Sequence, residues 1–262
     1  MSLDVIRARV VFRDRAFIDV LDLALRFMTV HVRLYARIAG VVLLPAIAVT
    51  YSVAWLGGWV AGWACAVVLG FAAQVPFTVV ASRVVFQEKV RAREVLRATL
   101  VELPRILVMR VLWAGAVGLA ALLVVAPAGW VATVFGFTNE VMLLERAPIG
   151  QSFGRSNRVA SSSLPDAILG LLVALAVPLL GVLLADLGGR QTLAELFQFR
   201  PPASAFTEGG SLLALVGWFG VIPYVATARF FIYLNVRTRV EGWDVQTRFA
   251  ALAARNDLAE AA

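Results

Sequence analysis

Three ionisable side chains interrupt otherwise apolar stretches of this sequence: Arg83, Glu140 and Arg229. A charge at membrane depth is stable only when it pairs with another charge, reaches water or extends to the headgroup layer. One hypothesis is therefore a buried Arg-Glu-Arg cluster that lines a cytoplasm-facing cavity and either binds an anionic headgroup or ties helices together. The alternative is that each side chain extends separately to the inner headgroups.

Conventional catalytic and metal chemistry lacks the residues it needs. His31 is the only histidine and Cys65 the only cysteine, so neither a histidine-based triad nor a thiolate or imidazole metal site can be assembled from this chain. The glycines of residues 150–154 do not have the spacing of a phosphate-binding loop. The sequence therefore predicts a protein that is not an enzyme and that binds neither a metal ion nor an organic cofactor.

The elements that position these charges belong to an unusually apolar chain. Of its 262 residues 61% are hydrophobic and 16% are charged, and the mean hydropathy is +0.84. A soluble domain of this size needs a more polar surface. Several apolar stretches approach the ~20 residues that cross a bilayer as a helix, and a helix satisfies its own backbone hydrogen bonds in lipid. We expect an all-α integral membrane protein that forms a single domain over residues 1–262.

The apolar stretches predict six transmembrane helices arranged as three hairpins. Gly57-Gly58 and Pro127-Ala128-Gly129 mark the first two turns, and Pro223 marks a kink in the last span. A single long, broken helix is the alternative for the second hairpin. A cytoplasmic amphipathic helix lying in the interface precedes each hairpin, over 4–34, 84–103 and 145–163. The predicted spans are 38–55, 59–80, 106–125, 130–144, 167–185 and 211–234.

The basic residues predict the orientation of the chain. All of them except Arg190 and Arg200 fall in, or at the border of, segments on one side of the predicted spans. By the positive-inside rule both termini are cytoplasmic. Arginine accounts for all but one of the basic residues, and alanine, valine and leucine dominate the chain. This composition is typical of a GC-rich bacterial genome and predicts the inner membrane of a bacterium.

A weak internal similarity relates the even-numbered spans. Val75-Pro76-Phe77 and its following residues resemble Ile222-Pro223-Tyr224 and theirs, and a shift of 57 residues lays the fourth span on the second. We interpret this as a pseudo-threefold repeat, with chance similarity in a small apolar alphabet as the alternative. In a true repeat Arg83, Glu140 and Arg229 lie at equivalent depths. The repeats would be residues 4–82, 83–144 and 145–236, followed by a cytoplasmic helix over 237–258.

Short motifs beside the spans carry a family resemblance. Together with the span order, they resemble the membrane domain attached to some bacterial glycerophosphodiester phosphodiesterases, which is more often a stand-alone membrane protein of unassigned function. Asn235 stands where an aspartate is usual, and Gly154 before Arg155 is unusual. The soluble phosphodiesterase barrel is absent, so its chemistry does not carry over. The residues concerned are Glu145, Arg155, Ser156, Tyr233, Asn235, Arg237, Glu241 and Asp244.

These observations favour a non-enzymatic membrane subunit or scaffold that docks other protein subunits through its cytoplasmic helices. A small transporter or lipid-handling protein, with a charged cavity facing the cytoplasm, is the alternative. The net charge of +7 does not indicate nucleic-acid binding, because the basic residues flank apolar spans. Anionic headgroups of the inner leaflet are the expected lipid partners, since each nearby basic residue contributes roughly 1 kcal/mol of attraction to them.

Overall fold

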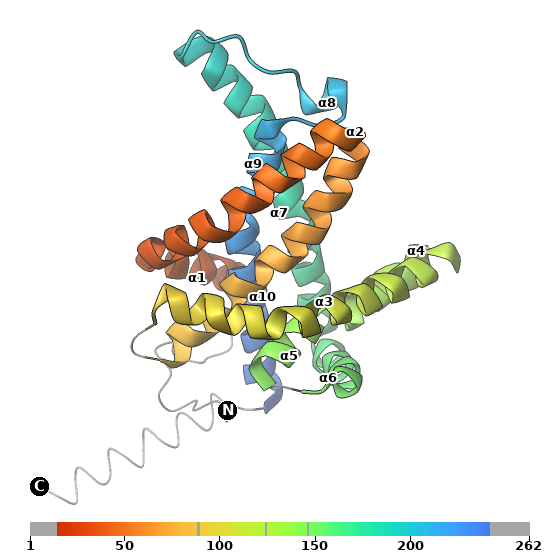
Figure 1. Cartoon of the computed structure of the whole chain (residues 1–262). Coiled ribbons are helices and arrows are strands. Elements are labelled where there is room, and N and C mark those ends of the chain that lie inside the picture. Colours follow the sequence, from red (N-terminus) through yellow and green to blue (C-terminus); the bar gives the residue numbers. More distant parts are fainter. Residues whose placement is uncertain (1–14, 88–89, 124, 146, 242–262) are drawn as a thin grey trace, which may run out of the picture.

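The computed structural model describes residues 15–87, 90–123, 125–145 and 147–241, and within these ranges the chain is helical, without a strand (Figure 1). In chain order the helices are α1 (Phe17–Val30), α2 (Val32–Phe86), α3 (Ala92–Leu123), α4 (Val125–Val134), α5 (Thr138–Glu145), α6 (Ile149–Ser162), α7 (Leu164–Gln191), the π-helical turn η2 (Thr192–Leu196), α8 (Ala205–Glu208), α9 (Leu212–Gly220) and α10 (Ile222–Glu241).

Four helical stretches of the described residues are long and apolar enough to cross a membrane. Each exceeds the ~20 residues that a hydrocarbon core of roughly 30 Å requires. The all-helical class expected from the sequence is thus confirmed, and the long apolar helices suggest a membrane protein. The four stretches are Val32–Phe86, Ala92–Leu122, Leu164–Leu196 and Leu212–Val240.

Helix α2 contains two arms that reverse at Gly58. This residue has φ 79° and ψ 167°, a conformation that costs glycine little because it has no Cβ. Below the turn the arms pack closely: a Cβ on Gly62 would lie 2.6 Å from that of Ala54, and the Thr50 hydroxyl is 3.9 Å from Cys65 Sγ. Figure 1 shows the two orange arms meeting at the upper right of the molecule, beside α8.

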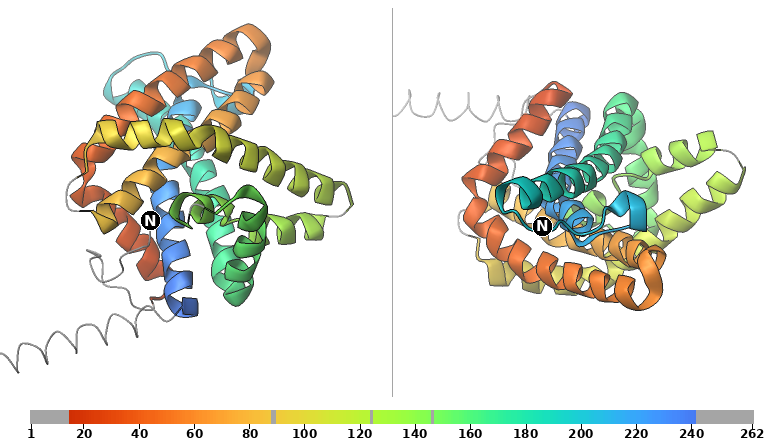
Figure 2. Two further views of the ribbon diagram at one scale, coloured as in Figure 1. Left: turned by 60° about the horizontal axis from the view of Figure 1, so that its bottom comes forward. Right: turned by 90° about the horizontal axis from the view of Figure 1, so that it is seen from above.

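Helix α10 lies at the centre of the bundle. It contacts α1, α2, α6 and α7, and the view from above in Figure 2 places it between α1 and α7. In the stretch formed by α9 and α10, 72% of the most apolar window is buried, against 22% for the corresponding windows of α3 and α7. Polar side chains on α10 must therefore find partners within the protein, whereas α3 and α7 present apolar side chains outward.

The second and third hairpin regions differ from the expected boundaries. Residues 92–103 are the first part of α3 and not a separate interfacial helix. Pro104 lies inside α3 without ending it. The predicted span 130–144 is divided by a turn at residues 135–137 into parts of α4 and α5. At 1.5 Å per residue these helices are about 15 and 12 Å long, so neither crosses a bilayer alone. In the last stretch the helix breaks at Val221, and Pro223 lies in the first turn of α10.

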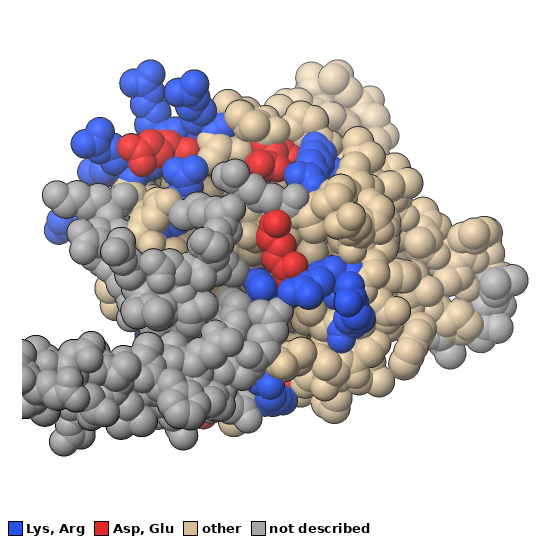
Figure 3. Space-filling view, turned by 90° about the horizontal axis from the view of Figure 1, so that it is seen from below, with Lys and Arg blue, Asp and Glu red and all other residues tan. Residues whose placement is uncertain are grey.

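The α3–α4 pair extends sideways from the bundle, with α4 running back beside α3 (Figures 1 and 2). Its outward side chains are large and apolar: Leu119, Leu122 and Trp130 are exposed. Charged side chains instead gather on the end of the molecule seen from below in Figure 3, while the flank at the right of that view is almost free of them. The end seen in Figure 3 is thus strongly charged, and the flank beside it is apolar.

A close approach between α7 and α9 generates a first prediction. A Cβ added to Gly181 of α7 would lie 2.7 Å from the carbonyl oxygen of Gly217 and 2.8 Å from Val221 Cγ1, whereas one added to Gly188 of the same helix meets open space. We expect Gly181→Ala to force the helices apart and lower the free energy of unfolding by about 1–3 kcal/mol.

The matched substitution Gly188→Ala is expected to be neutral or slightly stabilising, because alanine favours a helix over glycine. Thermal unfolding of the purified variants in detergent measures both effects. Equal melting temperatures for the two variants would contradict the close packing of α7 against α9.

Candidate functional site: two ion-pair clusters beside α10

Helices α10 and α5 carry facing sets of charged and polar side chains. Arg229, Tyr233 and Arg237 are spaced four residues apart on α10 and so share one face of that helix. Glu140 and Glu145 come from α5, which begins just after the turn at residues 135–137. The break in the predicted fourth span is thus what brings two carboxylates to α10.

The first cluster is a buried ion pair between Arg229 and Glu140. Arg229 Nε lies 3.0 Å from Glu140 Oε1 and Nη2 lies 3.3 Å from Oε2, while Nη2 also donates to the Gly136 carbonyl. The side chains are only 11% and 3% exposed. A guanidinium that makes two hydrogen bonds to one carboxylate has a defined orientation, so this pair fixes α10 against α5.

Arg110 of α3 completes the first cluster. It is buried, its Nη2 donates to Gln74 Oε1 at 3.1 Å, and its guanidinium carbon lies 4.8 Å from the centre of the Phe71 ring. Its charge also interacts with those of Arg229 and Glu140. The cluster therefore joins α3, α5 and α10, with the second arm of α2 supplying Gln74 and Phe71.

Arg83 does not take the place that the repeat hypothesis assigned to it. It is half-exposed near the end of α2, and within the described part of the chain it makes no ion pair or hydrogen bond with Glu140 or Arg229. Sequence reasoning missed Arg110 because it was counted among the basic residues flanking a span. The available signal was its position inside an apolar stretch, five residues beyond Arg105.

The second cluster surrounds Glu145 and contains four of the residues that carried the family resemblance. Glu145 Oε2 lies 2.8 Å from Arg155 Nε of α6. Its Oε1 accepts a 2.5 Å hydrogen bond from the Tyr233 hydroxyl and lies 3.4 Å from Arg237 Nη1. The carboxylate is 16% exposed, so this cluster is closer to the surface than the first. It ties α5, α6 and α10 together.

Two further residues of the resemblance bind backbone atoms. The Ser156 hydroxyl donates to the Val134 carbonyl at 2.9 Å. Asn235 accepts a hydrogen bond from Arg15 N and donates one to Arg15 O, each 3.1 Å long. An aspartate at this position has no N–H group to donate to Arg15 O, so the unusual asparagine has a structural role. The side chain of Glu241 is not described, and Asp244 and most of the predicted helix 237–258 lie outside the described residues.

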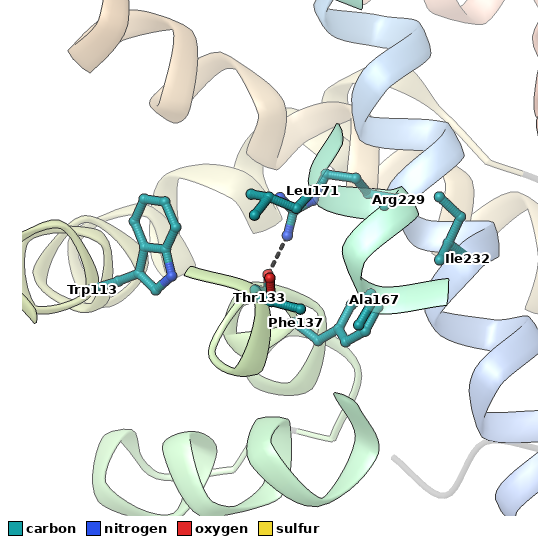
Figure 4. Close-up of a pocket in the computed structure, with 9 residues that line it drawn as sticks. Trp113, Thr133, Phe137, Ala167, Leu171, Arg229 and Ile232 are labelled. Atoms are coloured by element: carbon teal, nitrogen blue, oxygen red, sulfur yellow. Dashed lines mark hydrogen bonds between the residues drawn. The ribbon is translucent and has the colours of Figure 1, made fainter. Parts of the chain in front are cut away.

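A small cavity opens beside Arg229 (Figure 4). Its volume is about 20 Å³, and Trp113 of α3, Thr133 of α4 and Arg229 of α10 line it together with Gly136, Phe137, Ala167, Gly170, Leu171 and Ile232. This volume holds about one water-sized molecule. The cavity is thus too small for a headgroup or an organic solute.

No group of three metal-binding side chains comes together within the described ranges. The four long apolar helices suggest a helical membrane protein, and the ion pair between Arg229 and Glu140 is buried among the described helices. Comparison with protein-family models, with curated proteins and with solved structures gives no match.

The buried pair generates a second prediction. Glu140→Ala leaves Arg110 and Arg229 buried without a carboxylate, and we expect it to lower the free energy of unfolding by about 3–5 kcal/mol. The double variant Glu140→Met with Arg229→Met is expected to recover most of that loss, because it removes both charges. Reversible unfolding in mixed detergent micelles measures these values.

Glu102→Ala is the control, because its pair with Arg105 is longer, at 3.9 Å, and about one-third exposed on both sides. A loss of at most about 1 kcal/mol is expected there. If Glu140→Ala were no more destabilising than Glu102→Ala, the ion pair would not organise the bundle.

Proposed function

We propose that this chain is a non-enzymatic, multi-pass membrane subunit or scaffold that docks other proteins on its charged end. The observation that carries the proposal is the pairing of the ionisable groups around α10. The side chains of Arg229, Glu140 and Arg237 bind other elements of the same chain, and the adjoining cavity is only water-sized. Such groups organise helices, whereas a solute pathway needs them open to a passage.

The orientation proposed for the chain places the charged end in the cytoplasm of a bacterial cell. Helices α1 and α6 then lie at the inner interface, and the turn at Gly58 and helix α8 lie outside. The distribution of charge in Figure 3 supports this orientation through the positive-inside rule. Six crossings, the threefold repeat and kinship with the phosphodiesterase-associated membrane domains are parts of the same proposal.

Cysteine labelling tests the orientation and the number of crossings. In a Cys65→Ser background we expect a membrane-impermeant maleimide, added to intact cells, to label Glu208→Cys of α8 and Leu122→Cys of α3. Asn157→Cys of α6 is expected to react only after lysis. All three positions are exposed on the protein.

Labelling of Asn157→Cys from outside would reverse the orientation. Protection of Leu122→Cys until the membrane is dissolved would place the tip of α3 inside the bilayer and remove two of the six crossings. Equal labelling of all three variants in denaturant is the control for their intrinsic reactivity.

A second candidate function is the handling of an anionic lipid or solute. A surface groove of about 450 Å³ favours this function, because its lining combines two nitrogen-bearing side chains, His31 and Arg33, with apolar ones. The apolar side chains are those of Val30, Val32, Leu34, Val84 and Val90. Guanidinium groups bind phosphate well, and the neighbouring valines suit acyl chains. This groove, rather than the clusters beside α10, is the place for such a ligand.

Intact-mass measurement separates the two functions. We expect tagged protein, purified in a gentle detergent, to retain a protein partner at fixed stoichiometry. Arg158 is exposed on α6 at the proposed docking end, and Arg200 is exposed beyond η2 at the opposite end. Arg158→Glu is expected to reduce partner recovery several-fold by charge reversal, and Arg200→Glu to leave it unchanged. A lone chain that retains an anionic lipid or solute would overturn the scaffold proposal.

A further inference from the structure

The first cluster carries an excess of buried positive charge. It contains two arginines, Arg110 and Arg229, against one carboxylate, Glu140, which leaves a formal charge of +1. Among the described residues no second carboxylate bonds to either arginine: Arg110 binds the neutral Gln74 amide and the face of Phe71. A net charge buried in a membrane protein is costly unless another charge compensates it.

Two buried hydrogen-bond donors in the same region have no partner. They are Arg110 Nε and Trp113 Nε1, which come from the same face of α3, three residues apart. Buried donors are nearly always satisfied in proteins, so an orphan donor points to a missing acceptor. Trp113 and Arg229 both line the small cavity, and Figure 4 shows the nitrogen-bearing edge of the Trp113 indole turned toward it.

The size of the cavity selects the acceptor. At about 20 Å³ it admits a single water molecule or a monoatomic anion of similar size and excludes phosphate, sulfate and carboxylates. A water molecule satisfies donors but leaves the charge uncompensated. We propose that this cavity binds one halide ion, of the chloride class, between the Trp113 indole N–H and the Arg229 guanidinium, where it compensates the excess positive charge of the first cluster.

Equilibrium binding of ³⁶Cl⁻ to the purified full-length protein in detergent tests the proposal. The wild-type protein is expected to bind one chloride per chain saturably, with bromide and not gluconate as an effective competitor. Trp113→Phe keeps the aromatic ring and removes the donor, so it is expected to weaken chloride binding by about tenfold or more, the effect of losing one hydrogen bond to an ion. Arg110→Gln removes the excess charge and is expected to abolish saturable binding.

Arg105→Gln is the matched control, because it removes one positive charge from the same helix. Arg105 pairs with Glu102 and donates to the Ala147 carbonyl, outside the cavity. Chloride binding in Arg105→Gln is expected to match the wild type. Absence of saturable ³⁶Cl⁻ binding to the wild-type protein, or equal binding by Trp113→Phe and the wild type, would overturn the proposal and leave the cavity to water.

The melting temperature provides a second readout. Chloride is expected to raise it relative to gluconate at equal ionic strength in the wild type and in Arg105→Gln, because a ligand that binds only the folded state stabilises it. Trp113→Phe is expected to need at least about tenfold more chloride for the same rise. A halide effect of equal size in all variants would be a general salt effect and would contradict a site at this cavity.

Discussion

Burial of polar side chains on α10 is the constraint on which the arrangement of the other helices depends. Neither lipid tails nor apolar side chains can hydrogen-bond to these groups, so each needs a polar partner from another element. The partners come from different directions. The buried Thr227 bonds to Tyr35 of α2 and the buried Arg229 to Glu140 of α5, while the exposed Arg239 pairs with Asp166 at the start of α7. The rotation and depth of α10 are thereby set against three neighbours at once.

The ion pairs and the close glycine contacts contribute in different ways. Buried ion pairs add little net stability, because the cost of removing the charges from water offsets their attraction, but breaking one is expensive. Such pairs therefore select one arrangement of α5 and α10 over others. Stability within the membrane comes mainly from close packing, which the small residues Gly181 and Gly217 permit between α7 and α9.

The division between an apolar flank and a charged end gives the molecule two kinds of surface. The outward faces of α3 and α7 suit lipid, and several leucines along α7 are exposed there. At the other end Arg155 and Arg237 engage Glu145, so the charges there also brace α6 against α10. A charged end whose helices are held together by ion pairs, beside an apolar flank, is the physical basis for proposing a docking scaffold.

The sequence by itself determined the helical membrane class, the approximate position of the long apolar helices and the break at Gly58. These features follow from local properties, namely runs of apolar residues, backbone hydrogen bonding within a helix and the conformational freedom of glycine. It also drew attention to Glu140, Arg229 and the motif residues around Glu145. Tertiary structure alone decided which charges meet. Arg110 lies in the cluster where Arg83 was expected, and the span containing Glu140 is broken, because pairing depends on how separate helices are rotated and offset against one another. No local pattern in the chain encodes those relations.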